Sequence, residues 1–150
     1  MRQPERKAGF MLDMTTLATG MQLPAMVKEV RQENINLYAE ASGDHNPIHL
    51  DEEFARGTEL GGTIAHGMLV LAYISELMTA AFGQSWLEGG SLDVRFRIPA
   101  RPGDKVRVSG EVTAIIREDT NTVVKCRVDC RNERDEIIIN GDAAVRLNAA

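Results

Sequence analysis

The chain has 150 residues, of which 43% are hydrophobic and 26% are charged, proportions that suit a globular protein and argue against disorder. Its formal net charge of −5 argues against a general nucleic-acid binder, which needs a basic surface. We expect residues 1–10 to form a flexible lead-in and residues 11–150 to form a single domain.

The two cysteines, Cys126 and Cys130, are expected to be free thiols. On one strand they would lie roughly 13 Å apart. A disulfide needs its two Cα atoms within about 7 Å of each other. Because the N-terminal segment also lacks the long apolar core of a signal peptide, the sequence predicts a cytoplasmic protein.

Short elements are predicted before residue 60. Residues Leu23–Val30 can form a strand, and Asn34–Ala41 carry apolar side chains near one helical face. Gly43 is expected to end this helix. The segment SGDHNPIH, residues 42–49, then follows as a loop that Pro47 keeps from being helical, and the acidic residues after it can open a short helical turn.

The longest apolar stretch covers the nineteen residues from Ile64 to Phe82, with Thr63 as the expected N-cap. A run of this length is long enough to cross a membrane. However, it contains His66, Ser75 and Glu76, so we expect a helix that is buried on most sides in a protein core.

From Ser91 onward the apolar period changes to two, which is typical of strands. Turn segments at residues 99–104, 118–121 and 132–135 separate four such strands. The apolar residues expected on the core face are Leu92, Val94, Phe96, Ile98, Val106, Val108, Val112, Ala114, Ile116, Val124, Cys126, Val128, Cys130, Ile137, Ile139, Ala143, Val145 and Leu147. The predicted class is therefore α+β, with an antiparallel sheet wrapped around the long helix, as in the hot-dog fold.

Asp44 and His49 are the candidate catalytic residues, and the segment admits three interpretations. Asp44 can cap a turn, with His49 on the surface. A metal site at His45 and His49 is disfavoured, because Pro47 breaks a helix there and the sequence shows no larger ligand cluster. Alternatively, a rigid loop holds the carboxylate and the imidazole around one water, which suits addition of water across a double bond.

The segment AHGML, residues 65–69, places Gly67 near the start of the long helix. The first amides of a helix have no intrahelical acceptor, and a glycine lets a ligand carbonyl approach closely. Such an amide can stabilise negative charge that develops on a thioester oxygen. The alternatives are close helix–sheet packing at Gly67 and a structural role for His66.

Three segments resemble the signature of MaoC-like dehydratases and (R)-specific enoyl-CoA hydratases. They are YAEASGDHNPIHLDEEFA (Tyr38–Ala55), GGTIAHGMLVLAYIS (Gly61–Ser75) and FRIPARPGDKVRVSGEV (Phe96–Val112), within a resemblance that covers roughly residues 20–147. The resemblance implies a hot-dog fold and an acyl thioester substrate on coenzyme A or acyl carrier protein.

The resemblance also implies roles for single residues. The catalytic aspartate and histidine of the family fall on Asp44 and His49. The family's asparagine, helix glycine and serine fall on Asn46, Gly67 and Ser75. The residues expected to bind substrate are Asn46, His66, Gly67 and Ser75. We expect no metal and no cofactor apart from the carrier in the substrate.

The predicted activity is reversible hydration of a trans-2-enoyl thioester to an (R)-3-hydroxyacyl thioester. The alternatives are a hot-dog thioesterase and a non-catalytic subunit that binds acyl thioesters. Edge strands favour a homodimer or an assembly of dimers, without nucleic-acid or membrane partners. Four basic residues can either meet coenzyme A phosphates or form a solvated sheet face: Arg95, Arg97, Arg101 and Lys105.

Overall fold

The computed structural model describes residues 11–148, so the expected lead-in, residues 1–10, lies outside the described residues. The elements follow one another as β1 (Met26–Glu29), α1 (Gln32–Ser42), α2 (Pro47–Leu50), α3 (Glu52–Arg56), α4 (Gly67–Phe82), α5 (Gln84–Gly89), β2 (Gly90–Phe96), β3 (Lys105–Arg117), β4 (Asn121–Arg131) and β5 (Ile137–Asn148).

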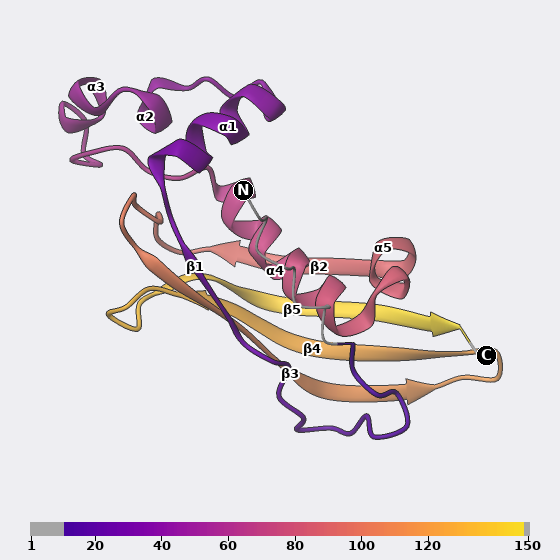
Figure 1. Ribbon diagram of the computed structural model, residues 1–150. Helices are drawn as coiled ribbons and strands as arrows, with labels where there is room; N and C mark the ends of the chain where they lie inside the picture. The colour runs from indigo at the N-terminus through magenta and orange to yellow at the C-terminus, as the bar shows by residue number, and fades with distance from the viewer. Residues whose placement is uncertain (1–10, 149–150) are drawn as a thin grey trace, which may run out of the picture.

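The strands form one antiparallel sheet in the order β1-β3-β4-β5-β2, and α4 lies across its inner face (Figure 1). The predicted α+β class and hot-dog arrangement are confirmed. As expected, α4 is buried on most sides, through Val70, Tyr73, Ile74, Leu77, Met78, Ala81 and Phe82. None of the helices within residues 11–148 combines the length and the apolar character that crossing a bilayer requires.

The start of the long helix was predicted wrongly. Helix α4 begins at Gly67 with His66 as its N-cap, rather than at Ile64 with Thr63 as its N-cap. The Thr63 hydroxyl instead donates to Glu52 Oε2 at 2.9 Å. The amide of Ala65 donates to the Ala100 carbonyl at 2.8 Å, and this contact ties the segment to the loop between β2 and β3 before the helix begins.

The loop prediction for residues 42–49 was also wrong in part. Pro47 begins the four-residue helix α2 and occupies its first turn, where a missing N–H costs nothing. Asn46 is the N-cap, and its Oδ1 accepts from the Ile48 amide at 3.2 Å. The prediction that Gly43 ends the preceding helix is confirmed: it adopts φ 78° and donates to the Ala39 carbonyl.

The face prediction for the end of β3 was wrong as well. The register between β3 and β4 shifts between Val112 and Ala114. Such a bulge turns the following side chains to the opposite face. Ile115 therefore packs against the core, whereas Ile116 is 42% exposed.

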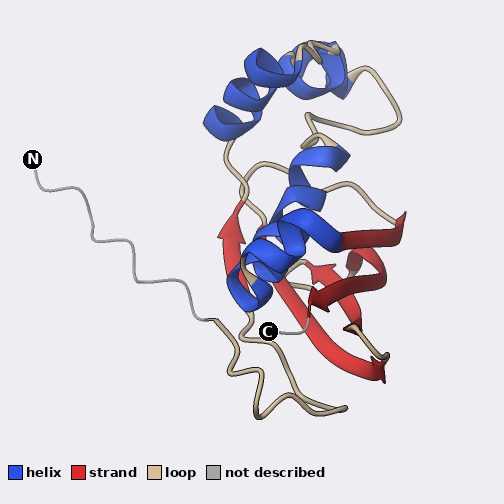
Figure 2. Ribbon diagram, turned by 90° about the vertical axis from the view of Figure 1, so that its right-hand side faces the viewer, coloured by secondary structure: helices blue, strands red, loops and turns tan. Residues whose placement is uncertain are grey.

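The short helices α1, α2 and α3 lie together beyond the N-terminal end of α4 (Figure 2). The Ile64 amide donates to the Ile48 carbonyl at 3.1 Å, which joins α2 to the segment leading into α4. This arrangement places the SGDHNPIH segment over the first residues of α4.

Candidate active site

His49 is buried on α2, and its imidazole has a defined orientation. Nδ1 lies 2.8 Å from the Ile64 carbonyl oxygen. A carbonyl can only accept a hydrogen bond, so Nδ1 carries the proton. In the neutral ring, Nε2 is therefore an unprotonated acceptor, and it lies 3.8 Å from Asp44 Oδ2.

Asp44 presents its carboxylate from the exposed loop after α1. Its Oδ1 accepts from the Asn46 amide at 3.2 Å, which leaves Oδ2 directed at His49. A separation of 3.8 Å is too long for a direct hydrogen bond. It suits one water that makes a hydrogen bond of about 2.8 Å to each atom.

His66 lies beneath this pair and is 2% exposed. Its Nε2 lies 3.0 Å from the backbone carbonyl oxygen of Asp44. Its ring stacks on the ring of His49, with centroids 3.9 Å apart and planes inclined by 28°. The structure thus joins three residues that the sequence analysis singled out.

The same three residues place potential metal-ligand atoms within 4.8 Å of one another. Their geometry does not suit a tetrahedral cation, because the in-plane lone pairs of two stacked rings do not converge on one point. One nitrogen of each ring is also engaged by a backbone carbonyl. The other histidine considered as a ligand, His45, turns to Glu40 at 2.9 Å, and this hydrogen bond raises the pKa of His45.

Gly67 is the first residue of α4 and is exposed. Among the residues that the structure describes, its N–H has no acceptor. A Cβ at this position would lie 3.0 Å from Cε1 of Phe96, a residue that is 54% exposed. Glycine therefore leaves room both for the phenyl ring and for a ligand atom near the amide.

A pocket of about 300 Å³ opens beside Gly67. It is mainly apolar, and its lining includes Ile64, Ala65, Val70, Phe96, Ile98 and Ile138. The volume is at the lower end of the range for small-molecule sites. Ile64 connects this pocket to the pair Asp44 and His49, since its carbonyl accepts the hydrogen bond from the His49 ring.

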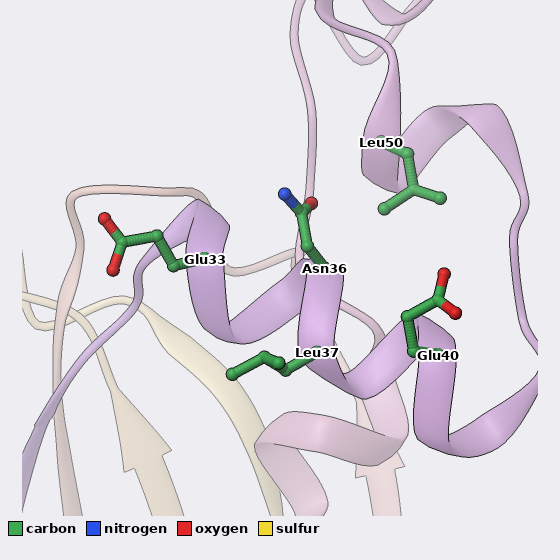
Figure 3. Close-up of a pocket in the computed structure, with 5 residues that line it drawn as sticks. All are labelled: Glu33, Asn36, Leu37, Glu40 and Leu50. Atoms are coloured by element: carbon green, nitrogen blue, oxygen red, sulfur yellow. The ribbon is translucent and has the colours of Figure 1, made fainter.

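A second hollow, of about 640 Å³, lies between α1 and Leu50 (Figure 3). Leu37 and Leu50 provide its apolar surface, and Glu33 and Glu40 line it with carboxylates. Neither Asp44 nor His49 lines it. Its negative charge also makes it unsuitable for the phosphates of an acyl carrier.

Asn46 and Ser75 occupy different environments. Asn46 belongs to the loop beside Asp44, where its side-chain oxygen caps α2. Ser75 lies eight residues after Gly67 along α4, a rise of roughly 12 Å. Its hydroxyl accepts from Trp86 Nε1 at 2.9 Å, and within residues 11–148 it makes no hydrogen bond to Asp44 or His49.

Sequence reasoning missed two features of this site. The first is the Ile64 carbonyl, which sets the His49 tautomer. A backbone carbonyl has no residue-type signature, so no pattern in the chain points to it. The second is the position of Phe96 over Gly67. The only sequence signal for it was that the segment beginning at Phe96 resembles part of the family signature.

Comparison with known proteins identifies the family. Residues 3–133 match the family model described as "MaoC like domain". The chain belongs to the MaoC-like family. It is 34% identical over 120 residues to a 3-hydroxybutyryl-CoA dehydratase of Methylorubrum extorquens, covering 80% of this chain and 74% of that protein. It is 30% identical over 128 residues to an (R)-specific enoyl-CoA hydratase of Rhodospirillum rubrum, covering 85% and 87%.

Solved MaoC-like structures share the fold. The MaoC-like dehydratase from Rhodospirillum rubrum superposes with a TM-score of 0.78 at 28% identity, covering 93% of this chain and 98% of that chain. The (R)-hydratase from Aeromonas caviae superposes with a TM-score of 0.75 at 29% identity, covering 88% and 98%. The predicted family is therefore confirmed.

Proposed function

We propose that this MaoC-like protein is a hydro-lyase that reversibly hydrates trans-2-enoyl thioesters to (R)-3-hydroxyacyl thioesters. The observation that carries the proposal is the unprotonated Nε2 of His49 facing Asp44 Oδ2 at 3.8 Å, a spacing that suits one shared water. The hydratase and dehydratase names of its relatives support the same reaction class.

In the hydration direction, the bridging water attacks C3 of the enoyl thioester. Asp44 is the general base in this proposal, and His49 accepts the second hydrogen bond of the water and orients it. The water supplies hydroxide to C3 and, through the pair, a proton to C2, so both residues end in their starting protonation states. Dehydration reverses these steps through the same transition state.

Gly67 supplies the electrostatic part of the proposed mechanism. Attack at C3 moves negative charge onto the thioester oxygen, and a free amide at the start of a helix stabilises that charge. The exposed Gly67 N–H, which lacks an acceptor among the described residues, is suited to this role. The adjacent apolar pocket of about 300 Å³ can take an apolar part of the substrate.

Several finer assignments remain proposals. Asn46 and Ser75 are proposed to contact substrate, the carrier is proposed to be coenzyme A or acyl carrier protein, and no metal or organic cofactor is proposed. A homodimer or an assembly of dimers would pair the edge strands. A cytoplasmic location rests on the two free, buried cysteines.

The test is a panel of trans-2-enoyl-CoA substrates of graded chain length, with loss of enoyl absorbance as the readout. Chiral chromatography of the product then reports its configuration. Release of free coenzyme A thiol without hydration would instead support a thioesterase. Saturable binding without any turnover of the panel would support a non-catalytic subunit.

A further inference from the structure

We infer that His66 is a positioning residue. It holds the Asp44 carboxylate and the His49 imidazole at the separation that the shared water needs, without touching the substrate. This inference rests on the proposed function and revises the expected role of His66, which the sequence analysis placed among the substrate-binding residues. Its burial, with 2% of its surface exposed, leaves it beneath the pair rather than beside a ligand.

The loop that carries Asp44 is exposed. Within the described residues, the Asp44 amide donates to Ser42 Oγ and its Oδ1 accepts from the Asn46 amide. Both partners are exposed and only two residues away: Ser42 is the last residue of α1, and Asn46 lies on the loop itself. The hydrogen bond from His66 Nε2 to the Asp44 carbonyl, 22 residues apart, connects this loop to the core. Without it, the peptide after Asp44 can rotate and carry the carboxylate away from His49.

Two contacts set the plane of the His49 ring. The hydrogen bond from Nδ1 to Ile64 fixes one edge of the imidazole but permits rotation about that contact. The His66 ring, stacked at 3.9 Å, opposes such rotation. His66 thereby sets the direction in which His49 Nε2 points, and its covalent neighbour Gly67 carries the amide proposed to bind the thioester oxygen.

The other ring nitrogen of His66, Nδ1, is also buried. Because Nε2 donates to a carbonyl, Nδ1 of the neutral ring is an acceptor, and this buried atom has no partner among the residues described. A buried acceptor without a donor destabilises the fold. A phenyl ring would pack between His49 and Tyr38 without that cost, so packing alone does not account for an imidazole here.

Two substitutions separate the hydrogen bond from the stacking. His66→Phe keeps an aromatic ring and removes the donor to Asp44, whereas His66→Gln keeps a distal N–H donor and removes the ring. We expect His66→Phe to lower kcat by about 10- to 100-fold, the scale of a small misplacement of a reacting group. We expect KM to stay within about twofold and His66→Gln to retain more kcat than His66→Phe.

The matched control is Tyr38→Leu, which removes the other aromatic neighbour of His66 at 4.8 Å and leaves the donor to Asp44 in place. We expect a lower melting temperature and a kcat within about threefold of the parent. In the Asp44→Asn background, His66→Phe should lower kcat by less than a further factor of about three, because both changes act on one carboxylate.

Parent-like kcat in folded His66→Phe protein would overturn the inference. So would a double variant, His66→Phe with Asp44→Asn, whose loss of kcat equals the product of the two single losses. If His66→Phe does not fold, His66→Gln decides: folded protein with a kcat about three- to tenfold below the parent supports the inference, because the donor is kept and the stacked ring is lost, and either a parent-like kcat or a larger loss overturns it. If the parent protein itself hydrates no enoyl thioester, the proposed function is refuted. This result is distinct from the variant results that would overturn the role of His66 alone.

Discussion

Replacing Gly67 with alanine should separate catalysis from stability. The added methyl would lie 3.0 Å from Cε1 and 3.1 Å from Cδ1 of Phe96. Ordinary carbon–carbon contacts are about 3.5–4.0 Å, so the ring must move by roughly half an ångström or more. Phe96 is 54% exposed and has space to move, so the fold should survive.

The stability change should be small, because alanine restricts the unfolded chain more than glycine does, an effect of about 0.4–1 kcal/mol that opposes the cost of displacing the ring. Activity should nevertheless fall. The methyl occupies the space through which a thioester oxygen reaches the Gly67 amide. Removal of one oxyanion donor typically costs about 10²–10³-fold in kcat.

The assay is kcat/KM on a short trans-2-enoyl-CoA, with the melting temperature measured on the same samples. Gly57→Ala is the matched control: Gly57 is also exposed, and a Cβ there would meet the Phe54 carbonyl at 3.3 Å. We expect parent turnover from the control. A Gly67→Ala value within threefold of the parent would refute the assigned role of the amide.

Further predictions concern the thiols, pH, cofactors and assembly. Burial raises the pKa of Cys126 to about 11 and that of Cys130 to about 12, so a thiol reagent at pH 8 should label both only after unfolding. Hydrogen bonds from Thr63 lower the pKa of Glu52 below 4.5. Its carboxylate therefore stabilises the fold above that pH, and the difference in melting temperature between the parent and Glu52→Gln should shrink as the solution is acidified. Activity should survive prolonged dialysis against a chelator, and loss that only a divalent ion reverses would count against the proposal. Light scattering should give at least a dimer, and a fully active monomer at micromolar concentration would contradict this.

The architecture could be predicted because two strong periodicities agree. The apolar run ending at Phe82 has too few polar residues for a surface helix, and the alternation after Ser91 requires a sheet with one buried face. Boundaries were less predictable, since they depend on contacts between distant segments. Thr63 is a good N-cap in isolation, but Glu52 engages its hydroxyl and the helix starts later.

Side-chain direction could be predicted only while the strand stayed regular. The alternation predicted Ile116 on the core face. Because of the bulge near Ala114, Ile115 faces the core instead and Ile116 is exposed. Nothing in the local sequence marks that bulge, because it arises from pairing with β4. Helix α5 was missed for a related reason: its Trp86 is buried through contacts that include Ser75 on α4.

The candidate site was predictable in its residue types and unpredictable in its geometry. Motif spacing identified Asp44, His49 and Gly67 as candidate site residues. In the structure, Asp44 Oδ2 and His49 Nε2 lie 3.8 Å apart. The sequence could not show that His49 is buried or that the Ile64 carbonyl fixes its tautomer, because both depend on the packing of α2 against residues 63–66.

Asp44 is the general base of the proposed mechanism. Asp44→Asn keeps the side-chain size and removes the negative charge and the proton-accepting oxygen. Loss of a general base typically costs about 10²–10⁴-fold in rate. His49→Ala should cause a comparable loss, and the double variant should be little worse than either one, since both residues act on one water.

The decisive measurement is turnover of a short trans-2-enoyl-CoA by Asp44→Asn protein that circular dichroism shows to be folded. Asp51→Asn is the matched control, because Asp51 caps α3 by accepting from the Phe54 amide at 3.0 Å and has no proposed part in the chemistry. We expect turnover at least about 100-fold below the parent for Asp44→Asn, the lower limit for loss of a general base, and near-parent turnover for Asp51→Asn. Turnover by Asp44→Asn within a few-fold of the parent, with only a lowered melting temperature, would rule out Asp44 as the general base and leave it as a turn-capping residue.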